Sequence, residues 1–186
     1  YRLSYQWGKG KDPSDSNFAT EGARDAYYPL CPGGASALLL PGSFTHSGKE
    51  GSTDAGTVTF ACADAALGKC ALRLGYLPYA SAPGVASLAS HHRACVRALR
   101  ADYCGDGKAH TAAGTPINIY DAIGVQRDGA AWPVEADFNE NGALCLSQPR
   151  WTQVPGAKAP VRQELPPDCA ARLRPCGPKL TAGALL

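Results

Sequence analysis

The chain of 186 residues contains no methionine and no apolar run that approaches the about 20 residues a helix needs to cross a bilayer. We therefore expect no membrane span. Charged residues make up 18% of the chain and the net charge is +2, which provides no general field for nucleic acid. No Gly-x-Ser-x-Gly elbow, His-Glu-x-x-His helix, P-loop or dinucleotide fingerprint is present, so no cofactor is expected.

The chain also lacks the close Cys-x2-Cys pairs that are typical of zinc sites, although it holds eight cysteines. An even number of widely spaced cysteines favours disulfides, which persist in oxidising compartments. We therefore expect a secreted or cell-surface protein. Since the sequence starts at Tyr1 without an initiator, we expect a mature chain after signal-peptide removal. The richness in Ala, Gly, Pro and Arg is typical of GC-rich bacterial genomes.

Hydrophobic periodicity predicts an α+β fold. Residues 57–62 alternate like a strand, and residues 65–72 form a short helix capped by Asp64. Apolar residues then recur at helical spacing over residues 85–103. This longer helix is expected to bury Cys95 and to pack His92 in the core, with its arginines on another face.

Further strands are predicted towards the C-terminus, over residues 116–120 with a continuation at 123–126, and over 131–138 and 143–146, the last two paired through a turn at 139–142. We expect a small antiparallel sheet packed on one long and one short helix, stabilised by disulfides. The domain organisation would be an irregular N-terminal wrap over residues 1–56, a core domain over 57–151 and a proline-rich extension over 152–186.

All eight cysteines are expected in disulfides: Cys31, Cys62, Cys70, Cys95, Cys104, Cys145, Cys169 and Cys176. Five of them lie in the core domain, so at least one must reach a flank. The simplest scheme pairs Cys169 with Cys176 and sends one core cysteine to Cys31. Many other connectivities stay open.

A long ordered series of residues between Thr57 and Trp151 resembles the ADYC-domain family, a group of secreted proteins found mainly in myxobacteria. The centre is Arg100-Ala-Asp-Tyr-Cys-Gly-Asp-Gly107, which contains the family's name motif. Further matches are Phe60-Ala-Cys62, Gly68-Lys-Cys70, Gly75-Tyr76, Pro78, His92, Cys95, His110-Thr111, Gly114-Thr115, Ile117, Tyr120-Asp121, Glu135-Ala136, Gly142-Ala143 and Cys145. The resemblance implies a secreted protein and carries no expectation of a particular activity.

The region after the long helix holds the candidate catalytic residues, Asp102, Cys104, Asp106 and His110. His110 could act as the base for a Cys104 nucleophile. Two neighbouring aspartates and a position at the end of a helix disfavour a thiolate, however. The alternative is a structural role: Cys104 in a disulfide, Asp102 paired with an arginine of the helix and Asp106 in an Asp-Gly turn.

Candidate binding residues are Arg93, Arg97, Arg100 and Trp132, although an arginine stripe on a helix is most often a solvated face. Asp137, Asn139 and Asn141 have the spacing of the first half of a calcium loop, but the twelfth position is Gln148 rather than the required Glu. We therefore expect a strand-joining turn there and no metal.

The leading functional interpretation is a non-catalytic extracellular module with a binding, recognition or surface-assembly role. Its partners would be an extracellular protein, a glycan or a second copy of itself, and not nucleic acid. One alternative is a secreted hydrolase with a site around Asp102, Cys104, Asp106 and His110. The other is a glycan-binding module that uses exposed aromatic residues such as Trp7, Trp132 and Trp151.

Overall fold

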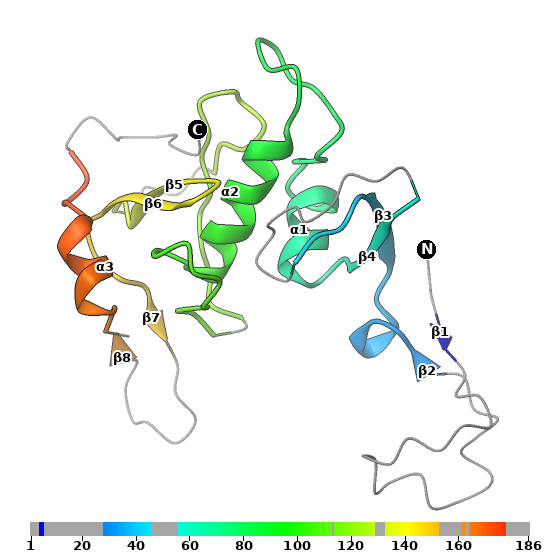
Figure 1. Cartoon of the computed structure of the whole chain (residues 1–186), viewed down its shortest axis with the longest axis horizontal. Helices are drawn as coiled ribbons and strands as arrows, with labels where there is room; N and C mark the ends of the chain where they lie inside the picture. Colours follow the sequence, from blue (N-terminus) through cyan, green and yellow to red (C-terminus); the bar gives the residue numbers. More distant parts are fainter. Residues whose placement is uncertain are drawn as a thin grey trace, which may run out of the picture.

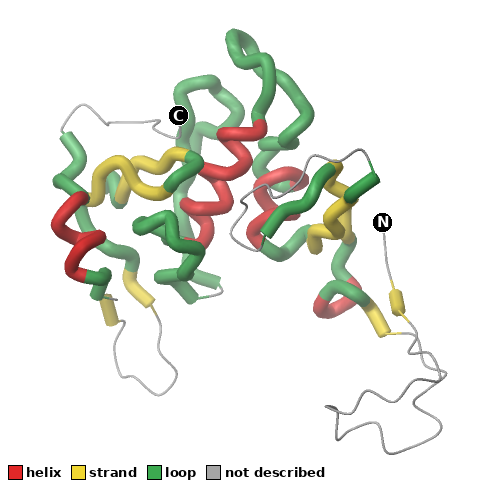
Figure 2. Tube along the Cα trace, viewed as in Figure 1, coloured by secondary structure: helices red, strands yellow, loops and turns green. Residues whose placement is uncertain are grey.

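The computed structural model of the chain describes residues 4–5, 28–45, 56–112, 114–128, 133–152, 161–162 and 164–177. It confirms the α+β class, with short antiparallel strand pairs and helices held together by four disulfides. Figure 2 shows that loops connect these elements over much of the described chain. Among the described residues, no helix is long and apolar enough to cross a membrane.

The 12-residue helix α2 (Ala89–Arg100) runs through the middle of the molecule (Figure 1). The shorter helix α1 (Ala66–Leu72) lies on one side of it, with the pair of strands β3 (Ala37–Pro41) and β4 (Val58–Cys62). The hairpin of β5 (Ala136–Asn139) and β6 (Gly142–Leu146) lies on the other side. Its apolar residues therefore face neighbours on both sides, which explains why seven of its residues are buried.

Within the part of the chain that the structure describes, the strands form four separate antiparallel pairs rather than one sheet. In the first larger pair, β3 (Ala37–Pro41) pairs with β4 (Val58–Cys62), and in the second, β5 (Ala136–Asn139) pairs with β6 (Gly142–Leu146). The remaining elements are short: β1 (Ser4–Tyr5) with β2 (Tyr28–Pro29), the 3₁₀ turn η2 (Pro32–Gly34), β7 (Trp151–Thr152) with β8 (Val161–Arg162), and helix α3 (Pro167–Arg172).

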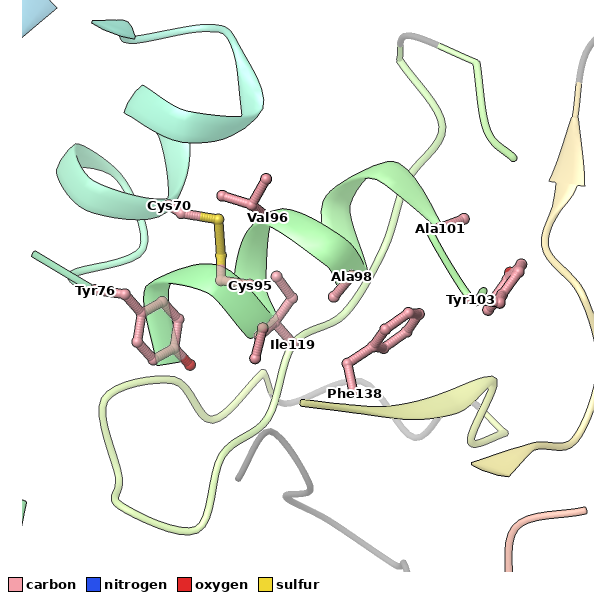
Figure 3. Packing of buried hydrophobic residues seen from close by; sticks show 10 residues of the cluster. Cys70, Tyr76, Cys95, Val96, Ala98, Ala101, Tyr103, Ile119 and Phe138 are labelled. Atoms are coloured by element: carbon pink, nitrogen blue, oxygen red, sulfur yellow. A yellow bond between two sulfur atoms is a disulfide. The ribbon is translucent and has the colours of Figure 1, made fainter. Parts of the chain in front are cut away.

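The main core lies between α2 and the segments packed around it (Figure 3). The Cys70–Cys95 disulfide joins α1 to α2 at its centre. Tyr103 and Phe138 stack with their ring centroids 5.6 Å apart. The core is thus a helix covalently tied to one neighbour and packed by aromatic rings against the other.

His92 is a fully buried core residue, as the apolar spacing of the helix predicted. Its Nε2 lies 3.0 Å from the Leu67 carbonyl oxygen, and its ring meets Phe44 edge-on at 5.8 Å. Burial lowers the pKa of His92, with the Leu67 hydrogen bond opposing the shift. The neutral ring therefore helps to hold α1 against α2.

Two predicted helix boundaries are wrong. The long helix begins at Ala89 rather than at residue 85, because Val85 instead pairs with Ala82 across a tight turn. The short helix begins at Ala66 without a side-chain cap, and the expected cap, Asp64, instead forms an ion pair with Arg73.

The strand predicted over residues 116–120 is also wrong. Its alternating residues Ile117 and Ile119 do pack against the core, but in the described ranges this segment has no partner strand beyond a single bridge between Tyr120 and Arg127. Its continuation at 123–126 is a bend, closed by Asp121. The alternation of apolar residues therefore indicates which side of this segment is buried. It does not show that the segment forms the hydrogen bonds of a strand.

Asp121 closes this bend by accepting hydrogen bonds from the backbone N–H groups of Gly124, Val125 and Gln126. It also accepts from the Tyr76 hydroxyl at 2.6 Å. Burial raises the pKa of Tyr76, and the neighbouring Asp121 adds to the shift, so the phenol keeps its proton and remains the donor.

In the predicted N-terminal wrap, residues 37–41 form strand β3, which pairs with the predicted strand β4. The paired strands of the C-terminal half are confirmed, although the first is limited to Ala136–Asn139. The described part of the C-terminal extension contains helix α3, which periodicity did not predict. This helix carries a disulfide, which explains how so short an element is held in place.

Candidate ligand pocket beside the Ala101–Cys104 turn

Helix α2 ends in a tight turn at the family motif. Ala101 has a left-handed backbone (φ 51°, ψ 40°), and the amide of Asp102 donates to the Arg97 carbonyl at 2.9 Å. Gly105 and Gly107 follow with φ of +71° and +85°. Three left-handed residues within seven positions reverse the chain abruptly, so the helix ends at Arg100 rather than at residue 103, to which its apolar spacing extended.

Asp102 is fully buried inside this turn. Its Oδ2 forms an ion pair with Arg97, itself only 5% exposed, and accepts a hydrogen bond from the Gly107 amide at 3.0 Å. The carboxylate therefore links the helix to the following loop. The predicted pairing of Asp102 with an arginine of the helix is observed, and the buried position of Arg97 departs from the expected solvated stripe.

Cys104 forms a disulfide with Cys169 of α3 and therefore has no thiol to act as a nucleophile. The other pairs are Cys31–Cys62, Cys70–Cys95 and Cys145–Cys176. All eight cysteines are in disulfides, and one core cysteine does reach Cys31, as expected. The predicted Cys169–Cys176 pair is wrong, because each of these cysteines crosses to a different part of the core domain.

Asp106 and His110 lie on different parts of the loop after the turn. Asp106 is exposed and accepts from the Lys108 amide at 2.9 Å. His110 is 7% exposed, donates its backbone N–H to the Arg100 carbonyl at 2.9 Å, and lies beside the Tyr103 ring with centroids 6.0 Å apart. The predicted Asp-Gly turn is thus observed, and His110 packs on an aromatic ring.

Tyr103 belongs to a buried polar network. Its hydroxyl donates to Glu135 at 2.7 Å and accepts from the Arg150 amide at 2.7 Å. The Arg150 side chain pairs with Glu135 at 2.9 Å and donates to the carbonyls of Ala98 and Leu99, the last turn of α2. Burial raises the pKa of Tyr103, and Glu135 adds to the shift. Arg150 thus caps the helix that the motif terminates, a role that the sequence did not reveal.

The four candidate binding residues have different environments. Arg93 is part of an ion pair with Glu140, with its Nη2 2.5 Å from Oε2, and Arg97 is buried against Asp102. Arg100 donates from Nη2 to the Gly107 carbonyl at 2.7 Å. Trp132 lies outside the described residues. Of these four, Arg100 lines a pocket.

The candidate metal-ligand residues form a hairpin turn instead. Asn139 Oδ1 accepts from the Asn141 amide at 2.8 Å, and Glu140 and Asn141 join β5 to β6. Asp137 is 7% exposed on β5, where burial raises its pKa to about 6, against a smaller opposing effect of the Phe138 amide. In the described part of the chain, no group of three or more His, Cys, Asp or Glu side chains is placed to hold a metal.

A pocket of about 470 Å³ opens beside the motif, between α1, the C-terminal end of α2 and the loop after the turn. This volume is in the range of small-molecule sites. The leucine and isoleucine residues of the pocket lining belong to the main core or pack against it. The lining residues are Asp64, Ala66, Lys69, Leu74, Leu99, Arg100, Ala109, Thr111, Ala112, Gly114, Thr115, Pro116, Ile117, Ile119 and Asp128.

The acidic side chains that line the pocket have bonding partners within the protein, and the basic side chains have no carboxylate partner among the described residues. Asp64 forms an ion pair with Arg73, and Asp128 accepts from the Ile119 amide at 2.6 Å. Lys69 and Arg100 form no ion pair with any carboxylate of the described residues. Two cations in this pocket therefore lack an anionic partner within the described part of the protein.

Sequence reasoning identified Arg100 and missed the rest of this pocket. The only signal was the alternation of Ile117 and Ile119, which indicated an apolar surface but was interpreted as a strand. Lys69 lies on a short helix, and no feature of the neighbouring sequence indicated that it lines a pocket. The pocket exists because α1 and its flanks lie against the end of α2 and the loop that follows it, a long-range contact that no local pattern predicts.

These features define a small α+β module that is held together by disulfides and carries an open pocket beside a buried helix-terminating turn. The chain belongs to the ADYC-domain family: the family model for the ADYC domain matches residues 6–152. The match starts well before the residue 57 at which the resemblance began. No curated protein and no solved structure was found to match the chain.

Proposed function

We propose that this protein is a secreted, non-catalytic binding module that recognises a small extracellular molecule in the pocket beside the motif. The observation that carries the proposal is the pocket of about 470 Å³ with an apolar lining and two cations that have no described carboxylate partner. Ligand sites in proteins combine such apolar walls with a few polar groups that orient the ligand. Secretion is supported by four disulfides, which persist in oxidising compartments.

The geometry lends no support to the hydrolase alternative. Cys104 is in a disulfide, and the Asp102 carboxylate is buried in contact with Arg97 and the Gly107 amide. A catalytic acid or base must reach the proton that it transfers. Asp102 instead has the contacts of a residue that holds the turn together.

The glycan-binding alternative stays a prediction. Trp7 and Trp132 lie outside the described residues, and only the backbone of Trp151 is described, in strand β7. Surface assembly stays a prediction as well. One feature bears on it: the outer face of the β3–β4 pair exposes Leu39, Val58 and Phe60, which is 50% exposed.

The proposed pocket can be tested with Nile red, a neutral apolar dye whose fluorescence rises in apolar surroundings. We expect saturable binding to the oxidised full-length chain. Ala112→Trp, which places a large side chain in the pocket lining, should weaken binding at least about tenfold. Ala86→Trp is the matched control, because Ala86 is exposed and does not line the pocket. Equal binding by the two variants, or no binding by the wild type, would contradict the proposal.

A further inference from the structure

We infer that the pocket binds an amphipathic anion: a small molecule with an apolar body and one carboxylate or sulfonate head, held near Lys69 and Arg100. This inference rests on the proposed function and specifies its ligand class. It follows from three properties of the pocket, namely its charge balance, its unused hydrogen-bond donors and its apolar surface.

The charge balance favours an anion. Of the four ionic groups that line the pocket, the two acids have partners: Asp64 pairs with Arg73, and Asp128 accepts from the Ile119 amide at 2.6 Å. The two cations, Lys69 and Arg100, have no ion-pair partner among the described residues. With Asp64 neutralised by Arg73, two positive charges face one negative charge, so an anionic head is the group that restores balance.

The hydrogen-bond donors near the motif also suit a carboxylate or sulfonate head group. A guanidinium offers five N–H donors in a planar fork that matches a carboxylate or sulfonate. Arg100 uses Nη2 to bind the Gly107 carbonyl at 2.7 Å, and no described residue accepts from its buried Nε. The Thr111 hydroxyl, also part of the lining, is buried without a described partner. Both of these atoms are buried from solvent in the structure, so the head group would bind through the Lys69 ammonium and the remaining guanidinium N–H groups of Arg100.

The rest of the ligand must be apolar. Leu74, Leu99 and Ile117 are partly buried residues that pack on the main core and also line the pocket, together with the buried Ile119. Covering such residues removes apolar surface from water, which favours binding of an apolar group. A small hydrophilic anion would leave this surface uncovered, and a purely apolar molecule would leave both cations without a partner.

Two fluorescent probes that share one aromatic body separate these possibilities: 8-anilinonaphthalene-1-sulfonate carries a sulfonate, and N-phenyl-1-naphthylamine does not. Fluorescence titrations of the oxidised full-length chain should show the sulfonate binding at least about tenfold more tightly. Lys69→Met should remove most of that preference, because it deletes a cation of the lining while leaving the neutral probe's affinity within about twofold.

Lys69 makes no described ion pair, so Lys69→Met is expected to fold. Arg100→Gln should have the same effect, although it also removes the contact to Gly107. Lys108→Met is the matched control, because the Lys108 side chain is 71% exposed and does not line the pocket. It should leave both affinities unchanged.

The outcomes distinguish the inference from the proposed function. If both probes bind equally and Lys69→Met changes neither affinity, the pocket is a binding site for neutral ligands and the inference is wrong. If Lys108→Met weakens binding of the sulfonate probe as much as Lys69→Met does, the preference for the anion comes from the overall charge of the protein. The inference is then again wrong. If neither probe binds the wild type, the proposed function fails with it.

Discussion

Gly105 and Gly142 meet where the motif turn rests on the β5–β6 hairpin. A Cβ atom on Gly105 would lie 1.7 Å from the carbonyl oxygen of Asn141, and one on Gly142 would lie 2.9 Å from the Gly105 amide nitrogen. The Ala143 amide donates to the Tyr103 carbonyl at 2.9 Å in the same contact. The two glycines therefore allow direct backbone packing between the end of α2 and the hairpin.

Gly105→Ala is expected to destabilise the protein by about 2–5 kcal/mol, since it combines a left-handed backbone with a clash against a backbone atom. Gly114→Ala is the matched control. Gly114 also has a positive φ, of +86°, but a Cβ there would meet nothing within 4 Å, so only about 1–2 kcal/mol should be lost. Urea unfolding with the disulfides intact measures both. Equal losses would show that the contact with Asn141 does not constrain Gly105.

The disulfide pairing predicts a specific peptide map. Tryptic cleavage without reduction should link the motif peptide, residues 101–108, to residues 163–172 through Cys104 and Cys169. It should link residues 128–150 to residues 173–179 through Cys145 and Cys176. Mass spectrometry identifies both, together with a free-thiol count of zero. A direct link between residues 163–172 and 173–179 would contradict the fold of the C-terminal region.

Asp102→Asn should cost about 3–5 kcal/mol of stability, because it leaves the buried Arg97 guanidinium without a carboxylate. Glu140→Gln is the comparison. It weakens the more exposed Arg93–Glu140 pair, whose side chains are 21% and 39% exposed, so about 0–1 kcal/mol is expected. Denaturant midpoints measure the difference. If Asp102→Asn folds as stably as the wild type, the carboxylate is not the structural link described here.

The buried carboxyl group of Asp137 should make the stability of the folded protein depend on pH. Burial raises its pKa from 3.8 to about 6, so the folded state keeps a proton that the unfolded chain releases between these values. Stability therefore falls as pH rises through this window, and the penalty persists above pH about 6. Asp137→Asn cannot ionise, so its stability relative to the wild type should increase by about 1–3 kcal/mol from pH about 4 to pH about 7.5. Unfolding curves of both proteins at the two pH values test this, and a constant difference would contradict it.

Local patterns were sufficient where a residue's neighbours in sequence decide its structure. The spacing of Cys95 and His92 located the buried face of α2, because an amphipathic helix packs its apolar side inward. Gly105 and Gly107 lie in the turn after that helix, since left-handed backbone favours glycine, although the helix itself ends at Arg100 with the left-handed residue Ala101. The strand over residues 58–62 and the β5–β6 hairpin followed from alternation and turn residues in the same way.

The errors share a different cause, which is that pairing depends on distant parts of the chain. Ile117 and Ile119 alternate like a strand, but among the described residues their segment pairs only through the single Tyr120–Arg127 bridge and forms no strand. Cys169 and Cys176 are close in sequence, yet each is held next to another cysteine of the core domain. Arg97 was expected in solvent and is buried, because it pairs with Asp102 and its Nε also donates to the Glu140 carbonyl of the distant β5–β6 turn at 3.3 Å.

The sequence by itself determined the α+β class, the presence of disulfides, the family resemblance and the central place of the Ala101–Cys104 motif. These depend on composition, periodicity and short-range turn chemistry. Only the tertiary structure decided the cysteine partners, the contact of Arg97 with the Glu140 carbonyl and the pocket that Lys69 shares with Arg100. Each of these requires segments far apart in the chain to converge, and that convergence is set by the packing of the whole core.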